Sequence, residues 1–266
     1  MNNNHFSDNS NSVWQCMKFK YFLMLLMNPR IVLQRLYNKQ DYGEPSDLGK
    51  LLKYLYDSCL MYSYEIDSAT EKIIKNFDER RRSTFISCYY NSQSITENML
   101  ARFGGDSGIA VCFHKAKLIR RCEADTIHKT VLHSAVKYQD FSCYDTVEKL
   151  KEDIESLDFF FNKFQENSDE QEFRIILDER QLYMVPNATG DGTLFDDSYA
   201  DIVKFIPIGL DSITRIAVRR QDFDDEYFMP NLCEKFGLNL SKDEQNKRLI
   251  NPIVSYEAVY EDNYDK

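Results

Sequence analysis

Metal-binding and disulfide patterns are missing from this sequence, although it contains seven cysteines. Their number is odd, they are widely spaced, and no pair has the C-x-x-C spacing of zinc and redox sites. These features argue against a disulfide framework and a structural zinc site, and reduced thiols are typical of a cytoplasmic protein. The cysteines are Cys16, Cys59, Cys88, Cys112, Cys122, Cys143 and Cys233.

Histidine-based metal motifs and a phosphate-binding loop are missing as well. The histidines His5, His114, His128 and His133 form no H-E-x-x-H or similar spacing, so we predict no metal site. The glycine-rich stretch RFGGDSG, residues 102–108, follows an expected helix and precedes an expected strand. A phosphate-binding loop has the opposite order, so these glycines indicate a helix stop and a tight turn.

The sequence also lacks a basic surface and a long apolar run. Its formal net charge is −10, and its largest basic cluster is the three arginines 80–82, so binding to free duplex nucleic acid is not expected. The apolar run 21–27 has seven residues, whereas a membrane span needs about 20. We predict a buried element there and no membrane association. The alternative is an export signal that starts at Met17.

What the sequence does contain is enough apolar material for one sizeable domain. Hydrophobic residues make up 43% of the 266 residues, with 18 Phe and 17 Tyr, and a chain of this length buries roughly three quarters of its unfolded surface. Residues 1–12 are rich in Asn and Ser and are expected to form a disordered tail. We predict a single domain over residues 13–260 and an acidic C-terminal tail, residues 261–266.

Apolar spacing and turn signals predict an α+β domain with a largely antiparallel sheet, flanking helices and a helical N-terminal part. We expect helices over residues 46–59, 69–79, 94–103, 147–164 and 227–237. We expect strands over residues 84–90, 107–113, 173–178, 202–209, 213–218 and 252–259, and a strand within 131–141. Ser94 and Glu97 have the spacing of a capping box, which predicts Ser94 as the cap of its helix.

The strongest candidate site is DEQEFRIIL, residues 169–177. Residues two apart on a strand share a face, so Glu170, Glu172 and Arg174 are expected to point the same way, opposite Phe173. One interpretation is a structural pair between Glu172 and Arg174 on a polar face. The other is a catalytic pair, in which one carboxylate stabilises a sugar-like cation and its neighbour orients or deprotonates a nucleophile.

Several segments resemble a widespread bacterial family of uncharacterised proteins, domain-of-unknown-function family twenty-nine seventy-one. They are FISCYY, MLARFGGDSGIAVCF and DEQEFRII, and their order and spacing agree with that family over residues 84–260. Leu100 and Phe103 stand where the family usually has tryptophan and tyrosine. The family's N-terminal signature is not recognisable before residue 84. The resemblance implies a bacterial protein of that family and assigns no activity.

The stretch EQEFRIIL is also similar to the E-x-E strand start of ADP-ribosyltransferases of the arginine–serine–glutamate class. This resemblance implies that Glu172 is catalytic and stabilises an oxocarbenium-like ribosyl cation formed from NAD. It implies that Glu170 orients the acceptor and that Ser87, from an earlier serine-containing strand, supports the nicotinamide pocket.

The same resemblance implies a set of NAD-binding residues. Ser87 and Arg174 are the candidates near the expected site. The class also has an upstream arginine that holds the NAD phosphates, and Arg30 and Arg35 are the only arginines before Arg80. No residue type in this set requires a metal ion.

Two functional hypotheses follow. The first is an NAD-dependent, ADP-ribosyltransferase-like enzyme with a macromolecular acceptor, acting as a bacterial toxin or phage-defence effector. The alternative is a non-catalytic protein-interaction module in which Glu172 and Arg174 form a structural pair. They differ in a spatial prediction. The enzyme needs Ser87 and Glu172 in one cleft with an arginine opposite, whereas the module has Glu172 on an open face or in a salt bridge with Arg174.

Overall fold

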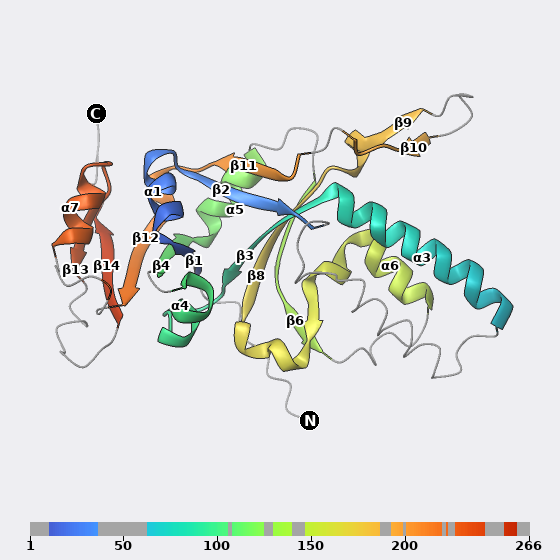
Figure 1. Cartoon of the computed structure of the whole chain (residues 1–266), viewed down its shortest axis with the longest axis horizontal. Coiled ribbons are helices and arrows are strands. Elements are labelled where there is room, and N and C mark those ends of the chain that lie inside the picture. Colours follow the sequence, from blue (N-terminus) through green and yellow to red (C-terminus); the bar gives the residue numbers. More distant parts are fainter. Residues whose placement is uncertain are drawn as a thin grey trace.

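The structure, a computed structural model, describes residues 11–36, 63–105, 108–124, 130–139, 147–186, 193–198, 201–219, 222, 227–242 and 253–259. These residues form an α+β fold in which one large sheet lies between helices (Figure 1). Neighbouring strands of that sheet pair antiparallel. The predicted fold class, α+β with a largely antiparallel sheet and flanking helices, is therefore confirmed.

The large sheet runs in the order β11-β2-β3-β1-β4-β12-β14-β13, and β8 joins β3 and carries β5. Its strands are β1 (Ser12–Lys18), β2 (Arg30–Arg35), β3 (Thr84–Tyr90), β4 (Gly108–His114), β5 (Thr130–Ala135), β8 (Glu172–Asp178), β11 (Val203–Pro207), β12 (Ile213–Arg219), β13 (Asn239–Lys242) and β14 (Ile253–Val259). Two small ribbons stand apart from it: antiparallel β9 (Met184–Pro186) with β10 (Thr193–Phe195), and parallel β6 (Lys137–Gln139) with β7 (Asn162–Phe164).

The sheet divides at β3. Strand β8 pairs with all seven residues of β3. Strand β2 pairs with β3 at Phe85 and Ile86, and β1 pairs with it at Tyr90. A strand has only two edges, so β1 and β2 share the second edge of β3. Strand β3 is therefore the junction between the glutamate-bearing strand β8 and the N-terminal strands.

Helices cover both faces of the sheet. They are α1 (Phe19–Met27), α3 (Ser63–Ser83), α4 (Glu97–Gly104), α5 (Lys115–Ala124), α6 (Val147–Ser156) and α7 (Phe228–Glu234), with 3-10 turns η3 (Asp158–Phe161), η4 (Gln165–Glu170), η5 (Arg180–Tyr183) and η6 (Leu210–Ser212). On one face, α1, α5 and α7 contribute Phe22, Leu118 and Met229 to the largest core cluster. On the other face, α3, α6 and η3 form a second cluster, and α4 forms a third.

Strand β8 is buried on both faces because helices cover both. Phe173 and Ile175 pack into the core beneath α1 and α5, and Ile176 packs into the cluster beneath α3 and α6. Glu172 and Arg174 share the face of Ile176. The candidate site therefore lies between two hydrophobic clusters, at a depth where a charged side chain needs partners.

The prediction of a helical N-terminal part is wrong. Strands β1 and β2 flank the nine-residue helix α1, and β1 lies inside the large sheet, paired over seven residues with β4. In β2, buried Ile31 and Leu33 alternate with exposed Val32 and Gln34, which is the period of a half-buried strand. The pattern is only six residues long, and arginines stand at both of its ends, so the sequence signal is weak.

The predicted helix over 147–164 is too long. Helix α6 ends at Ser156, and Leu157 adopts a left-handed conformation with φ of 69°. The chain then continues through η3, where Phe159, Phe160 and Phe161 are all buried against the cluster beneath α3 and α6. The left-handed residue and the 3-10 turn interrupt the α-helical period, and β7 follows directly.

The helix after β3 begins later than predicted, and its cap lies two residues further along the chain. Thr96, and not Ser94, caps α4, because the Thr96 Oγ1 accepts a 3.3 Å hydrogen bond from the Met99 N–H. The predicted glycine stop is confirmed: α4 ends at Gly104, and Gly105 has a φ of 71°, which a residue with a Cβ rarely adopts.

The other predicted elements have mixed outcomes. The strands over 84–90, 107–113, 173–178, 202–209, 213–218 and 252–259 and the helices over 69–79 and 227–237 are confirmed within a few residues, and α3 extends well before residue 69. The strand expected within 131–141 is divided into β5 and β6. The predicted helix over 46–59 and the tails 1–10 and 261–266 lie outside the described residues, and Ser12 already belongs to β1. In the described part of the chain, no helix is long and apolar enough to cross a bilayer.

Candidate functional site

The E-x-E motif lies where η4 turns into β8. Glu170 ends η4, Gln171 has a positive φ of 42°, and Glu172 begins β8. The register places Tyr90 of β3 directly opposite Glu172 and Cys88 opposite Arg174. Residues opposite each other in an antiparallel pair share a face, so Tyr90 is the β3 side chain nearest to Glu172 along the sheet.

Glu172 and Arg174 form a buried ion pair, as one of the two interpretations of the sequence predicts. The Arg174 Nε donates to the Glu172 Oε2 at 2.8 Å, and the Arg174 Nη2 lies 2.8 Å from the same oxygen. The side chains are only 3% and 6% exposed. Arg174 Nη1 also donates to the carbonyl oxygen of Phe160, which ties the end of η3 to β8. A buried pair of this kind is tolerated only when its remaining donors and acceptors are satisfied.

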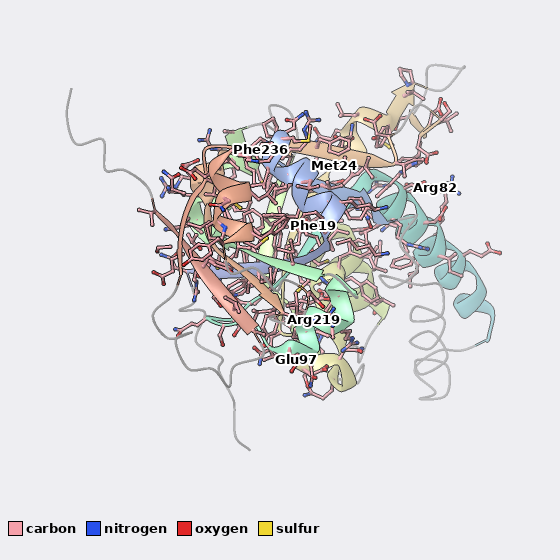
Figure 2. All side chains as sticks on the ribbon, turned by 60° about the vertical axis from the view of Figure 1, so that its left-hand side comes forward. Phe19, Met24, Arg82, Glu97, Arg219 and Phe236 are labelled. Atoms are coloured by element: carbon pink, nitrogen blue, oxygen red, sulfur yellow. The ribbon has the colours of Figure 1, made fainter. Side chains whose placement is uncertain are left out.

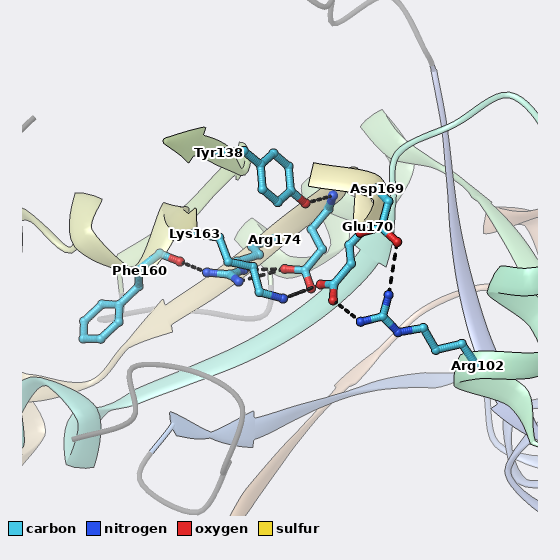
Figure 3. Close-up of polar contacts among 8 residues, drawn as sticks. Arg102, Tyr138, Phe160, Lys163, Asp169, Glu170 and Arg174 are labelled. Atoms are coloured by element: carbon cyan, nitrogen blue, oxygen red, sulfur yellow. Dashed lines mark hydrogen bonds and ion pairs between the residues drawn. The ribbon is translucent and has the colours of Figure 1, made fainter. Parts of the chain in front are cut away.

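Lys163 of β7 joins the two glutamates. Its Nζ contacts the Glu170 Oε2 and lies 3.3 Å from the Glu172 Oε1. Both carboxylate oxygens of Glu172 therefore meet a cation of the same chain, with Lys163 at Oε1 and Arg174 at Oε2. Figure 3 shows these two cations next to each other. Each contact is charge-assisted, and such bonds are stronger than neutral ones.

Arg102 closes the arrangement from α4, on the far side of the two glutamates (Figure 3). Its Nη2 donates to the Glu170 Oε1 at 2.7 Å, and its Nη1 donates to the Asp169 Oδ2 at 3.3 Å. Both oxygens of Glu170 are thus engaged as well. We call the six residues the charged cluster: Arg102, Lys163, Asp169, Glu170, Glu172 and Arg174.

The charged cluster holds three cations and three carboxylates, so its formal charges balance. Its two buried carboxylates nevertheless interact unfavourably. Burial raises the pKa of Glu170, and the neighbouring Glu172 raises it further, against the opposing effect of Lys163. The arrangement therefore keeps two like charges close together by surrounding them with cations.

Tyr138 of β6 supports the start of β8. Its hydroxyl oxygen accepts a 2.7 Å hydrogen bond from the Glu172 backbone N–H, and the Val136 N–H donates to the Glu172 carbonyl oxygen at 2.8 Å. Burial raises the pKa of Tyr138, with a further contribution from the charge of Glu172. The phenol therefore stays neutral at physiological pH and remains a hydrogen-bonding brace.

Ser87 does not join the charged cluster. It lies opposite Ile175, on the face that packs beneath α1 and α5. Its Oγ donates to the Tyr89 hydroxyl at 3.1 Å and accepts from the Gln15 Nε2 at 3.5 Å. The expectation that Ser87 and Glu172 line one cleft is therefore not met, because the sheet separates them.

The two upstream arginines are engaged elsewhere. Arg35 is buried at the end of β2, where it forms an ion pair with Asp197 and donates to the carbonyl oxygen of Arg82. Arg30 stacks over the ring of Phe205, with 5.3 Å between the guanidinium carbon and the ring centroid. Neither guanidinium contacts Glu170 or Glu172 in the described structure. The cations that do contact them are Arg102, Lys163 and Arg174.

Arg102, Lys163 and Tyr138 were missed from the sequence. Arg102 precedes Glu170 by 68 residues and Tyr138 precedes Glu172 by 34 residues, so no local spacing connects them. Lys163 is nine residues before Glu172, but the sequence predicted a helix over this region, whereas Lys163 lies on strand β7. The only local signal is the E-x-E-x-R spacing itself, which indicates that a buried cation accompanies the glutamates.

A closed cluster of this kind limits what Glu172 does chemically. A carboxylate that stabilises a ribosyl cation or deprotonates a nucleophile needs an oxygen aimed at the substrate, whereas both Glu172 oxygens face cations of the chain. Within the part of the chain that the structure describes, no three His, Cys, Asp or Glu side chains are placed to hold a metal ion. What the geometry provides directly is a brace between α4, η3, β7 and β8.

Comparisons with known proteins found no match to a protein-family model, to a curated protein or to a solved structure. The two resemblances described above therefore stay predictions that rest on their motifs alone.

Proposed function

We propose that this chain is a cytoplasmic, non-catalytic protein-interaction module in which the charged cluster braces the fold. The observation that carries the proposal is the buried Glu172–Arg174 pair, whose carboxylate is fully occupied by Arg174 and Lys163. Ser87, the residue expected to complete a catalytic site with Glu172, lies on the other face of the sheet.

The cluster is well placed for a structural role. Arg102 comes from the helix over one hydrophobic cluster, and Phe160 belongs to the neighbouring one. Arg174 and Glu172 lie between them on β8. The ion pairs therefore connect the helix over one cluster to the 3-10 turn of the other, and they engage both oxygens of each buried carboxylate.

A second candidate function is ADP-ribosyl transfer from NAD to a macromolecular acceptor, in the role of a toxin or phage-defence effector. One observation favours it: Tyr90 is half-buried and lies directly opposite Glu172 on the same sheet face. In this version Tyr90, and not Ser87, contacts the nicotinamide by stacking, and Glu172 faces the ribose. It requires Arg174 and Lys163 to release an oxygen of Glu172 when NAD binds.

Nicotinamide release from NAD distinguishes the two functions. The wild type and Glu172→Gln are incubated with labelled NAD and a bacterial lysate, and thermal unfolding is followed in parallel. We expect no release and no label transfer by either protein. We also expect a clear fall in the unfolding temperature of Glu172→Gln, because the change leaves Arg174 buried without its charge partner. Glu152→Gln, a change of the same kind at an exposed site on α6, is the matched control and should leave the unfolding temperature unchanged.

Release of nicotinamide by the wild type, lost in Glu172→Gln, would establish cleavage of NAD at this site and reject the proposal, and transfer of the label to a lysate protein would establish the transferase. In that case Tyr90→Ala should lower turnover and Ser87→Ala should leave the chemistry unaffected, because only Tyr90 shares the face of Glu172.

A further inference from the structure

Helix α1 packs against the largest core cluster with one side and exposes an apolar surface on the other side. Its inner side buries Phe22, Leu25 and Leu26. On its outer side Tyr21 is 51% exposed, Met24 60% and Met27 71%. These three residues recur every third position, so they form one stripe along the outside of the helix. Singly exposed apolar residues are ordinary, but a continuous stripe marks an interaction site.

Helix α7 packs beside α1. The ring of Phe228 lies 6.1 Å from that of Phe19 on α1, and Figure 2 shows the two helices next to each other. We call Tyr21, Met24 and Met27 the α1 surface. It combines an aromatic ring with flexible thioether side chains, which adapt to the shape of a partner.

The segment of the sequence that contains α1 is opposite in charge to the chain as a whole. Residues 11–36 contain two lysines and two arginines and no Asp or Glu, whereas the chain as a whole has a net charge of −10. Lys18 and Lys20 are exposed at the start of α1. Helix starts usually carry acidic residues because of the helix dipole, yet the first turn of α1 has none. Acidic groups of a partner would compensate this positive end.

We propose that the α1 surface binds an acidic amphipathic helix of a partner protein. The apolar side of such a helix packs against Tyr21, Met24 and Met27, and its carboxylates meet Lys18 and Lys20. Helix α1 is about 13 Å long, which matches two to three turns of a packed partner helix. This inference rests on the proposed function, because it names the partner class of the interaction module.

The same charge pattern disfavours an anionic membrane as the occupant. A planar membrane would approach the whole side of the molecule, including the exposed Glu234 of α7, and would be repelled by the net negative charge. A helix is narrow enough to contact the cations of α1 alone. The two exposed lysines at the start of α1, in a segment without acidic residues, therefore favour a helical protein partner.

The test is binding of the full chain to a labelled synthetic helical peptide of about four turns, with leucine on one side and glutamate beside it, followed by fluorescence anisotropy. The matched peptide has lysine in place of glutamate. We expect the acidic peptide to bind about tenfold more tightly or better than the basic one, and to weaken as salt is raised. Equal binding of the two peptides, or no binding of either, would overturn the inference.

Two pairs of variants locate the binding surface. Met24→Ala and Lys20→Glu should each weaken binding of the acidic peptide about fivefold or more. Ile74→Ala and Lys72→Glu are the same kinds of change at exposed positions on α3, and they should leave binding unchanged. All four sites are exposed, so each variant is expected to fold. Equal effects at α1 and α3 would reject the α1 surface.

Two further outcomes separate this inference from the proposed function. Sedimentation of the chain with phosphatidylserine vesicles, lost in Lys20→Glu, would replace the helix partner by a membrane and overturn the inference. Failure of peptide binding without nicotinamide release would remove the α1 surface and leave the interaction role intact. Nicotinamide release that depends on Glu172 would reject the proposed function itself, whatever the peptide does.

Discussion

At the scale of single residues, Arg174 uses all three of its guanidinium nitrogens to connect β8 to its surroundings. It holds Glu172 through two nitrogens and the Phe160 carbonyl through a third. All of these groups are buried, so water is not available to replace a lost partner. Removing one member of the pair therefore lowers the stability of the fold, because the other member stays buried as a charge without its partner.

We expect Arg174→Met to lower the free energy of unfolding by about 3–5 kcal/mol, since it leaves Glu172 buried with fewer partners. The double variant Glu172→Gln with Arg174→Met should recover a large part of this loss, because it removes both charges. Urea unfolding of the four proteins of this cycle measures the coupling. Lys151→Ala, which breaks the exposed Lys151–Glu155 pair on α6, is the control and should change stability by less than about 0.5 kcal/mol. A loss in Arg174→Met as small as that of the control would contradict the structural role.

Glu170 predicts a specific pH dependence. Its pKa is raised in the folded protein by burial and by Glu172, so above the model-peptide value of about 4.5 the folded state binds more protons than the unfolded state. The contribution of Glu170 to stability is therefore complete below that value and is lost as pH rises through the folded pKa. We expect the stability of Glu170→Gln, relative to the wild type, to increase as pH rises through this window. Urea unfolding at a series of pH values measures the difference, and an opposite trend would show that Lys163 and Arg102 outweigh burial.

At the scale of elements, short side-chain contacts decide where helices begin. The sequence offers Ser94 as a cap, but Ile95 is buried against the cluster beneath α4, and this places Thr96 at the start of the helix. Ser94 is exposed, and its backbone N–H donates to the Ser92 Oγ. A single packed residue thus selects between two capping candidates.

We expect Thr96→Ala to lower the free energy of unfolding by about 1 kcal/mol, because it removes the acceptor of the Met99 N–H. Ser94→Ala is the matched control and should cost less than about 0.5 kcal/mol. Chemical unfolding of the two variants checks the assignment. A larger effect at Ser94 would restore the capping box that the sequence predicts.

At the scale of the whole molecule, the large sheet joins the first and last described strands. Strand β1 lies between β3 and β4, and β4 leads through β12 to β14. Strand β3 continues on its other side into β8 and β5. A sheet with this order unfolds as one unit if its strands share one core.

Trp14 reports on that unit, since it is the one tryptophan of the chain and is buried at the centre of the sheet. Its indole N–H donates to the Ser92 carbonyl oxygen at 3.1 Å. We expect the shift of its fluorescence and the loss of far-ultraviolet circular dichroism to coincide in a single urea transition. Two separate transitions would show that the predicted single domain over 13–260 consists of independent units.

The sequence predicted the elements whose signals are local. Strands β3, β4 and β8 follow from runs of β-branched and aromatic residues, and Gly105 ends α4 because its positive φ suits glycine. The E-x-E-x-R spacing likewise indicated a shared face for Glu170, Glu172 and Arg174, and Glu172 and Arg174 do share one. These features depend on neighbours within a few residues.

The sequence was a poor guide where long-range contacts decide. Strand β1 has no regular alternation of buried and exposed positions, and the alternation in β2 is only six residues long with an arginine at each end. Pairing with β4 and β11 makes them strands. The helix predicted over residues 147–164 ends before Leu157, because burial of the η3 phenylalanines outweighs continuation of the helix.

The sequence by itself determined the α+β class, the acidic balance of the chain and the shared face of Glu172 and Arg174. Only the tertiary structure decided that Ser87 lies on the opposite face, that Arg102 and Lys163 complete the charged cluster, and that α1 exposes an apolar stripe. The physical reason is the register of β3 against β8. A shift of one residue exchanges the two faces of a strand, and the register is set by core packing across the whole sheet.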